Sequence, residues 1–459
     1  MGLLDTLLPL VTLLSIIATT AILCLLPSRY PADDKGRKGR VAVLVLGDIG
    51  RSPRMQYHAI SLANNGWGVD LIGYDESSPR PEILSSAAIR IIPLPPPPPF
   101  LATSSSKALF PLIAPFKVLF QLSALFYLLL YIIRPPSYIL VQNPPSIPTL
   151  VVARIVALLR NSRLVVDWHN FGYSILGLKL GEGHPLVRAS QWYERTFGKG
   201  AYANFTVTHK MRTVLKSDFG ITTPIYTLHD RPPAHFQPFS GLQRDQFLST
   251  HPLTADNFPS QATKLLISST SWTPDEDFRI LLSALQHYAA AAASSPSTNR
   301  LPNILAIITG KGPQLPSYIP LISALNSEST HVTIRTAFLP AEEYPQLLAC
   351  ADLGVCLHTS SSGVDLPMKV VDMFGVGVPV AAVRFEAIGE LVRDGGNGVV
   401  FDARGGSGEE LGEILIRLFG DSNELEVLKE GAMREVERRW EGEWDSVARR
   451  VFEGKAKVQ

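Results

Sequence analysis

The chain has 459 residues and nearly balanced charge, with 42 basic and 41 acidic side chains. The net charge of +1 gives no sign of nucleic-acid binding, and the length favours about two to three domains. Hydrophobic residues make up 46% of the chain, an excess that membrane segments can explain. The three cysteines show no metal-ligand spacing. Three cysteines also exclude a disulfide framework as the organising principle, which favours a reducing compartment.

Residues 6–26 are uncharged and mostly apolar. As a helix they would extend about 31 Å, enough to cross the hydrocarbon core of a bilayer. A cleaved signal peptide would carry basic residues before the apolar run. Here they follow it, at Arg29, Lys35, Arg37, Lys38 and Arg40. The positive-inside rule therefore predicts a single membrane anchor within residues 1–28, with a lumenal N-terminus and a cytosolic body.

The first half after this anchor alternates between strand and helix patterns. An apolar, β-branched run at residues 41–46 precedes a glycine-containing loop, a helical pattern at 54–64 and a second apolar run at 69–74. Further strands are expected at 138–142, 163–168, 205–207 and 225–228, and helices at 148–159, 185–197 and 210–218. This order predicts a parallel sheet in a Rossmann-like domain over residues 40–235.

The second half repeats the alternation. Strands are expected at residues 265–268, 304–309, 332–336, 353–357, 380–383 and 399–401, and helices at 275–292, 340–349, 367–374 and 410–419. This order predicts a second doubly wound domain over residues 263–459, joined to the first by a linker at 236–262. Two such domains facing a cleft bind ligands at the carboxyl ends of their strands. Dehydrogenases and periplasmic binding proteins share that geometry, so the fold alone does not decide the function.

A second apolar stretch covers residues 109–133 and is interrupted by Lys117 and Gln121. The uncharged part after Lys117 has 16 residues, fewer than the roughly 20 that a transmembrane helix needs. A buried core helix and a second span remain open. The sequence favours a helix that lies in the membrane interface.

In the second half, a loop containing Ser361, Ser362 and Gly363, called the serine loop below, leads from a predicted strand into a helix. That helix carries Lys369 and Asp372. Free backbone N–H groups at such a helix start bind anions, and Lys369 would add a full charge. Asp372 could hold the hydroxyls of a ribose. An ordinary helix start with a capping acid would produce the same pattern.

Two weaker motifs lie nearby. Lys311 stands between two glycines after a predicted strand, where a diphosphate could approach closely or the chain could simply turn. The acidic run at residues 275–277 resembles a D-x-D metal-binding motif. Acidic residues are also common in a first helical turn, and no metal site is predicted from this run.

In the first half, Gly47, Asp48, Gly50 and Arg51 follow the first predicted strand. They take the place of a dinucleotide phosphate loop, but the full G-x-G-x-x-G pattern and the acidic residue closing the second strand are missing. Asp48 and Arg51 are instead expected to project into the cleft from the strand end.

Another polar group, Asp167, His169 and Asn170, also stands at a predicted strand end. A single histidine is more often structural than catalytic. A histidine clustered with an acid and an amide at a strand terminus is a stronger functional candidate.

Several longer stretches resemble the chitobiosyldiphosphodolichol β-mannosyltransferases, a family that adds the first mannose to the dolichol-linked core glycan. They are GDIGRSPRMQYHA from Gly47, QNPPSIPTL from Gln142, VDWHNFGYSIL from Val166, LHDRP from Leu228, SSTSWTPDEDF from Ser268, ITGKGP from Ile308 and DLGVCLHTSSSGVDLPMKVVDMFGVGVPV from Asp352. The resemblance covers nearly the whole chain outside the anchor and the linker.

The resemblance implies a GT-B fold and an inverting transfer from GDP-mannose to GlcNAc2-diphosphodolichol on the cytosolic face of the endoplasmic reticulum. It also implies contact with membrane lipid and a complex with other glycosyltransferases of that pathway. It implies no required cofactor, with a divalent cation as an optional activator. A retaining GT-B transferase acting on a lipid acceptor and a catalytically silent nucleotide-sugar scaffold are the alternatives.

Related retaining families carry an E-x7-E motif in the donor domain. Asp372 matches its second acid, whereas the first position falls at Val364, beside Asp365. The basic pair that usually grips the diphosphate after the first donor-domain strand is not evident, so Lys311, Lys369 and the serine loop must supply more of that grip. An inverting displacement also needs one general base. Asp48 is the first candidate, followed by His169 and Asp167; His169 could instead contact the donor sugar.

Overall fold

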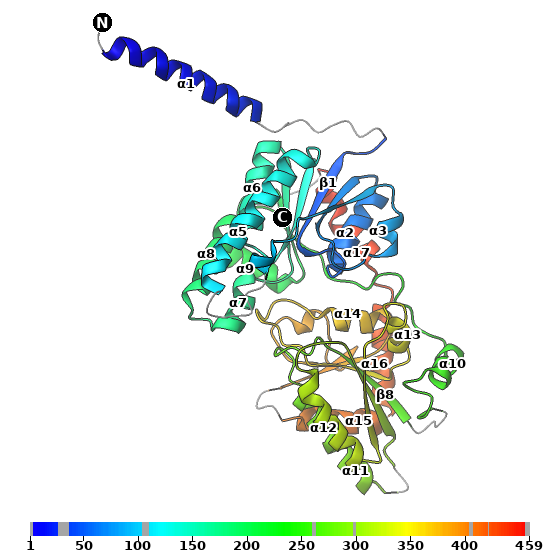
Figure 1. Ribbon diagram of the computed structural model, residues 1–459. Helices are drawn as coiled ribbons and strands as arrows, with labels where there is room; N and C mark the ends of the chain where they lie inside the picture. The colour runs from blue at the N-terminus through cyan, green and yellow to red at the C-terminus, as the bar shows by residue number, and fades with distance from the viewer. Residues whose placement is uncertain are drawn as a thin grey trace. The chain divides into compact units, whose positions relative to one another are not determined.

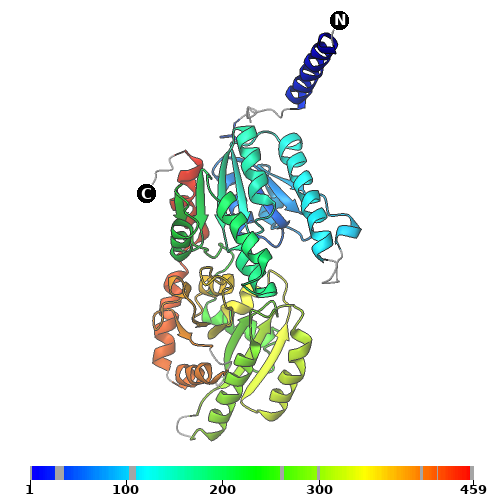
Figure 2. The same ribbon diagram turned by 90° about the vertical axis from the view of Figure 1, so that its left-hand side faces the viewer.

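The computed structural model describes residues 3–25, 36–102, 110–258, 263–296, 300–403, 407–420 and 422–454. The chain divides into two compact units. Unit 1 comprises residues 1–167 and 192–204, and unit 2 comprises residues 168–191 and 205–459. Both views show helices on the two faces of each sheet, as expected for doubly wound domains (Figure 1, Figure 2).

Seven strands form the first sheet, in the order β3-β2-β1-β4-β5-β6-β7. They are β1 (Arg40–Asp48), β2 (Gly68–Tyr74), β3 (Ile89–Pro93), β4 (Tyr138–Asn143), β5 (Arg163–Trp168), β6 (Ala203–Thr206) and β7 (Ile225–Thr227). Central β1 pairs in parallel with β2 and β4, and residues 41–46 are buried. Burial on both faces explains the unbroken apolar run in the sequence. The edge strand β3 was not predicted.

Among the described residues, unit 1 contains six α-helices and one π-helix besides part of α8. They are α1 (Leu3–Leu25), α2 (Pro53–Asn64), α3 (Pro81–Ser85), α4 (Pro99–Ala102), α5 (Phe110–Tyr127), the π-helix η1 (Leu128–Ile132) and α6 (Thr149–Arg160). Helices α5 and α6 lie side by side on one face, whereas α2 and α3 lie on the other (Figure 1). The helix α8 (Pro185–Phe197) begins in unit 2 and continues into unit 1.

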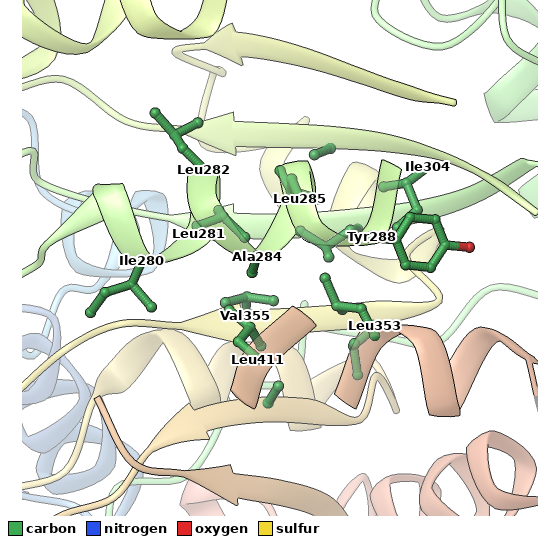
Figure 3. Packing of buried hydrophobic residues seen from close by; sticks show 14 of the residues in the cluster. Ile280, Leu281, Leu282, Ala284, Leu285, Tyr288, Ile304, Leu353, Val355 and Leu411 are labelled. Carbon is green, nitrogen blue, oxygen red and sulfur yellow. The ribbon is translucent and has the colours of Figure 1, made fainter. Parts of the chain in front are cut away.

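Six parallel strands form the second sheet, in the order β10-β9-β8-β11-β12-β13. They are β8 (Thr263–Ser269), β9 (Asn303–Thr309), β10 (Val332–Ala337), β11 (Leu353–Cys356), β12 (Val380–Val383) and β13 (Gly398–Phe401). This is the strand order of a Rossmann fold, which confirms the predicted doubly wound fold of the second half. Its core includes Leu281, Leu285, Val355 and Leu411, packed between helices and sheet (Figure 3).

The other helices of unit 2 are α7 (Gly172–Leu180), α9 (His209–Ser217), α10 (Gly241–Thr250), α11 (Phe278–Ser294), α12 (Leu315–Glu328), α13 (Tyr344–Ala349), α14 (Met368–Gly375), the 3-10 helix η2 (Ile388–Glu390), α15 (Glu409–Gly420), α16 (Ser422–Glu435), α17 (Trp440–Val447) and α18 (Arg449–Phe452). The predicted linker thus contains a helix, α10, which starts at a capping box made by Ser240 and Gln243. Helix α11 starts three residues later than predicted, because Asp277 is its N-cap.

Candidate functional site

Asp48 ends β1, and its carboxylate is oriented by the backbone. Its Oδ1 accepts N–H groups from Gly50, Glu76 and Ser77 at 3.2, 3.3 and 3.1 Å. Burial raises the pKa of this carboxyl, but a hydrogen bond from the Ser77 side chain, together with these three N–H groups, outweighs burial and holds the pKa below its usual value. The buried Oδ2 has no hydrogen-bond partner and lies 3.4 Å from Nε of the exposed Arg51. Asp48 is therefore ionised, and one of its oxygens is not engaged in a hydrogen bond.

The two glycines beside Asp48 have different roles. Gly47 lies within β1 rather than in the predicted loop. At Gly50, a Cβ atom would lie 2.4 Å from the carbonyl oxygen of Ser77, so only glycine lets the loop pack against the segment after β2. That packing brings the Ser77 N–H to Asp48.

Asp167 is the penultimate residue of β5 and is completely buried. Arg54 on α2 donates two hydrogen bonds of 2.9 Å to its two oxygens, and Nε2 of His58 lies 3.2 Å from Oδ2. Arg54 and His58 are four residues apart on one helical face, a spacing that could have marked them in the sequence. Because Arg54 occupies both oxygens, this geometry argues against Asp167 as the general base and makes it an anchor between α2 and β5.

The segment after Asp167 contacts the serine loop of the predicted donor site. Nδ2 of Asn170 donates to Oγ of Ser361 at 3.2 Å, and Oγ of Ser174 lies 3.2 Å from the same atom. Oδ1 of Asn170 accepts the N–H of Phe171 at 2.7 Å, which fixes the amide. His169 is half-buried at the end of β5. The sequence predicted Asn170 and Ser361 as members of two separate groups, and the structure brings them into contact.

The serine loop is held by Asp365, whose Oδ1 accepts hydrogen bonds from Ser360 and, at 3.2 Å, from Ser362. Gly363 has φ +74°, a left-handed conformation that glycine adopts without strain. Helix α14 begins at Met368, and its N-cap Pro367 makes no side-chain capping hydrogen bond. The loop is therefore pre-shaped by Asp365, and no capping acid occupies the start of α14.

His358 follows β11 and was not singled out in the sequence. Its Nδ1 lies 3.4 Å from Asp275 and its Nε2 3.6 Å from Asp365. Burial lowers the pKa of this imidazole, but the two carboxylates outweigh that effect and raise the pKa to about 9. His358 is therefore a cation at neutral pH beside the serine loop. Its position directly after a parallel strand was the available sequence signal.

Lys369 in the first turn of α14 forms an ion pair with Glu276. Glu276 is buried and also accepts hydrogen bonds from Oγ1 of Thr270 at 2.6 Å and from the N–H of Ser271 at 3.2 Å. The acidic run at residues 275–277 is thus divided among a histidine, a lysine and a helix cap. That division argues against the D-x-D metal interpretation.

The glycines around Lys311 pack against the protein's own backbone. A Cβ at Gly310 would lie 1.8 Å from the carbonyl oxygen of Thr270, and one at Gly312 would lie 1.7 Å from that of Ser271. The ammonium of Lys311 lies 3.8 Å from the centroid of the Phe338 ring, a cation–π contact. The glycines therefore serve loop packing, and this geometry gives no support to Lys311 as a diphosphate ligand.

Asp372 lies one turn after Lys369 on α14. Burial, and next the charge of Asp230, raise the pKa of Asp372 to about 8. Two carboxyl groups therefore share this region of unit 2, and one of them is protonated at neutral pH. Asp230 belongs to the LHDRP stretch but was not selected from the sequence.

Among the described residues, His209, His229 and Glu390 could together hold a metal, with ligand atoms within 4.8 Å of one another. Glu390 already accepts the N–H groups of His209 and Lys210 at 2.7 and 2.9 Å. Burial lowers the pKa of His229, but Glu390 and Glu443 outweigh it and raise that pKa overall. His229 and Glu390 are thus engaged with each other and with Glu443, so this cluster is better explained as an ion-pair network.

One helical segment of the described chain, Ile113–Ile132 in α5 and η1, is long and apolar enough to cross a membrane, and only 22% of it is buried. A shorter apolar segment, Val11–Ala21, lies within α1. Leu125 and Leu129 are fully buried, whereas Phe116 and Leu119 are largely exposed. Arg160 on α6 donates to the carbonyl oxygens of Leu129 and Ile133, at 3.2 and 2.8 Å. The segment thus packs on unit 1 along one face only, which contradicts a core helix.

The two Rossmann-type sheets, together with matches of both halves to glycosyltransferase families, show that the protein is a GT-B glycosyltransferase. Residues 50–223 match the family described as glycosyl transferase 4-like domain, and residues 264–421 match glycosyl transferases group 1. Sucrose-phosphate synthase from Thermosynechococcus elongatus shares the fold, with a TM-score of 0.62 at 14% identity over 90% of this chain and 98% of that one.

The chain belongs to the family of chitobiosyldiphosphodolichol β-mannosyltransferases. A protein of that name from Arthroderma benhamiae is 45% identical over 96% of this chain and 98% of its own length. The UDP-glycosyltransferase TURAN from Arabidopsis thaliana is 40% identical over 90% of this chain and 97% of its own length.

Proposed function

We propose that this enzyme transfers mannose from GDP-mannose to GlcNAc2-diphosphodolichol with inversion, giving Man-GlcNAc2-diphosphodolichol for protein N-glycosylation. The observation that carries the proposal is the 45% identity with a relative named for β-mannosyl transfer to chitobiosyl-diphosphodolichol, which extends over almost the full length of both chains. The arrangement of charged groups after the strands of each sheet is consistent with this chemistry.

In unit 2, the donor diphosphate would lie against Ser361, Ser362 and Gly363. Two cations, His358 and Lys369, stand beside this loop, and both are balanced by carboxylates in the ligand-free protein. Fixed charges of this kind stabilise the negative charge that develops on a leaving diphosphate. Asp372 would accept a hydrogen bond from a hydroxyl of the ribose. These residues supply the electrostatic role without requiring a metal, although a divalent cation could add to it.

In unit 1, Asp48 would act as the general base. It is ionised, because three backbone N–H groups stabilise its carboxylate, and its Oδ2 has no hydrogen-bond partner. An oriented carboxylate can take the proton of the acceptor hydroxyl as that oxygen attacks the sugar. Gly47, Gly50 and Arg51 would shape the acceptor side of this site.

The test of the base is Asp48→Asn in the full-length protein. The amide retains the size of the side chain but cannot accept the proton, so kcat should fall by about 10²–10⁴-fold with the affinity for GDP-mannose unchanged. Asp75→Asn, an exposed acid shortly after β2, is the matched control and should retain full turnover. Full turnover by a folded Asp48→Asn enzyme would remove Asp48 from this role.

The donor and the stereochemistry need separate measurements. The name of the Arabidopsis relative mentions UDP, so a UDP-sugar is the second candidate donor. Purified protein should be offered GDP-mannose or UDP-sugars with a lipid-linked chitobiose, and the product anomer determined. A β-linked mannose supports the proposal, and an α-linked product indicates a retaining enzyme. No transfer by folded protein with any donor would favour a silent scaffold.

We further propose that α1 anchors the chain in the endoplasmic reticulum membrane as a single span, with the catalytic body in the cytosol. The exposed face of α5 and η1 would lie in the membrane interface and meet the lipid acceptor. Association with other transferases of the pathway would pass the product along one surface. In sealed microsomes, added protease should cleave the body; protection of the body would refute this orientation.

A further inference from the structure

A small cavity of about 260 Å³ in unit 1 is lined by four arginines, Arg37, Arg40, Arg90 and Arg134. They come from three distant parts of the chain: the segment leading into β1, the strand β3, and the turn after η1. Asp70 forms ion pairs with two of them, Arg40 and Arg90. These four arginines and Asp70 together carry a formal excess of three positive charges.

The inner part of this cavity is fixed. Asp70 is fully buried and accepts hydrogen bonds from Nη2 of Arg40 at 2.6 Å and Nε of Arg90 at 2.9 Å. Nη2 of Arg37 donates to the carbonyl oxygen of Ala87 at 2.9 Å, which holds its guanidinium over the segment before β3. Two of the four arginines are thus organised by one carboxylate and a third by a backbone carbonyl.

The fourth arginine, Arg134, is not held by a hydrogen bond within the described residues as the other three are. Arg134 is exposed and makes no hydrogen bond or ion pair with any residue that the structure describes. Guanidinium groups that converge with too few carboxylates are suited to phosphate, which they bind through paired N–H groups. The cavity therefore has the charge and the donors of a phosphate site.

The cavity lies close to the end of one apolar helical segment, and it follows the other, α1, along the chain. Arg134 is two residues after Ile132, the end of the apolar helical segment, and so within about 7 Å of it along the chain. Arg37 is twelve residues after Leu25, the end of α1, a distance of at most about 40 Å when extended. Basic pockets beside membrane helices on the cytoplasmic side bind the head groups of anionic lipids.

We propose that this arginine cavity binds the phosphate of an anionic membrane phospholipid. It is separate from the reaction site, because β1 runs from Arg40 at the cavity to Asp48 at its other end. Those eight steps along a strand correspond to about 26 Å. The diphosphate of the proposed acceptor lies only two sugar rings from its reacting hydroxyl, so it does not reach the cavity while that hydroxyl meets Asp48. The bound lipid would fix the body against the bilayer beside the acceptor.

The experiment uses full-length protein in detergent and native mass spectrometry to count retained lipid after addition of phosphatidylinositol or phosphatidylcholine. Wild type should retain one phosphatidylinositol in preference to phosphatidylcholine. The double variant Arg37→Gln, Arg134→Gln removes two exposed cations and should weaken retention about 30-fold. The double variant Arg300→Gln, Arg450→Gln removes two exposed arginines that do not line the cavity, and it should retain lipid as wild type does.

A second arm uses wild-type protein alone, so it does not depend on the folding of any variant. Inorganic phosphate and the soluble head group glycerophosphoinositol are added as competitors. Glycerophosphoinositol should displace the lipid only at much higher concentration, because it lacks acyl chains. Equal retention by wild type and the Arg37, Arg134 variant would overturn the site. Displacement by inorganic phosphate at concentrations comparable to the lipid would overturn the lipid as its occupant.

Discussion

The ion pair between Lys369 and Glu276 allows the structural and donor-binding roles of one lysine to be separated. Glu276 is 1% exposed and Lys369 is 23% exposed. Removing one partner of a buried pair costs about 3–5 kcal/mol when the other charge is left without compensation. Here Glu276 keeps its hydrogen bonds to Thr270 and Ser271, and water reaches the lysine. We therefore expect Lys369→Met to lower the free energy of unfolding by about 2 kcal/mol.

The double variant Lys369→Met, Glu276→Gln removes both charges and should recover stability to within about 1 kcal/mol of wild type. It should not recover donor binding, because the proposed contact of Lys369 with the diphosphate is still missing. Glu276→Gln alone frees the ammonium and should bind GDP at least as well as wild type. Urea denaturation measures the stability of the four proteins, and isothermal titration calorimetry measures GDP binding.

Two results would refute this reasoning. If Lys369→Met is as stable as wild type, the ion pair does not support the loop between β8 and α11. If the double variant binds GDP with wild-type affinity, Lys369 is not a donor ligand, and the positive charge of the site comes from His358.

Two further outcomes are expected from other ion pairs. His358 has a pKa of about 9 against an ordinary 6.5, so its contacts stabilise the fold fully below pH 6.5, and that stability is lost as the pH rises through 9. His358→Asn should therefore reduce the change in melting temperature between pH 7 and pH 10. Arg54→Met leaves the buried Asp167 without its main partner and should cost about 3–5 kcal/mol in urea denaturation, whereas adding Asp167→Asn should restore most of it.

The strands were largely predictable because buried parallel strands are continuous apolar runs. The exception, β3, has alternating partial exposure and a charged residue, Arg90, so it lacks that signature. Helix α12 was missed because Pro316 and Pro320 interrupt its pattern, and α10 because its polar composition is typical of a linker. Tertiary packing and a local cap stabilise these helices where propensity does not.

The positions of the candidate site residues were predictable, but their partners were not. Strand ends in a parallel sheet mark the functional edge, which located Asp48, Asp167 and the serine loop. The contacts that decide what these residues do join positions far apart in the chain. Lys369 pairs with a residue 93 positions away, and Asp167 with one 113 positions away. Such pairings depend on the order of the strands in the folded sheet, which the periodicity and spacing of the sequence do not determine.

Asp48 and Asp167 show why this limit matters for mechanism. Both lie at the carboxyl end of a strand of the same sheet, and no pattern in the sequence separates their roles. In the structure, Arg54 and His58 contact the oxygens of Asp167, so this carboxylate holds α2 to β5. Backbone N–H groups hold one oxygen of Asp48 and leave the other without a hydrogen bond. A general base needs a fixed orientation together with a lone pair that no hydrogen bond occupies, and of these two carboxylates Asp48 combines them.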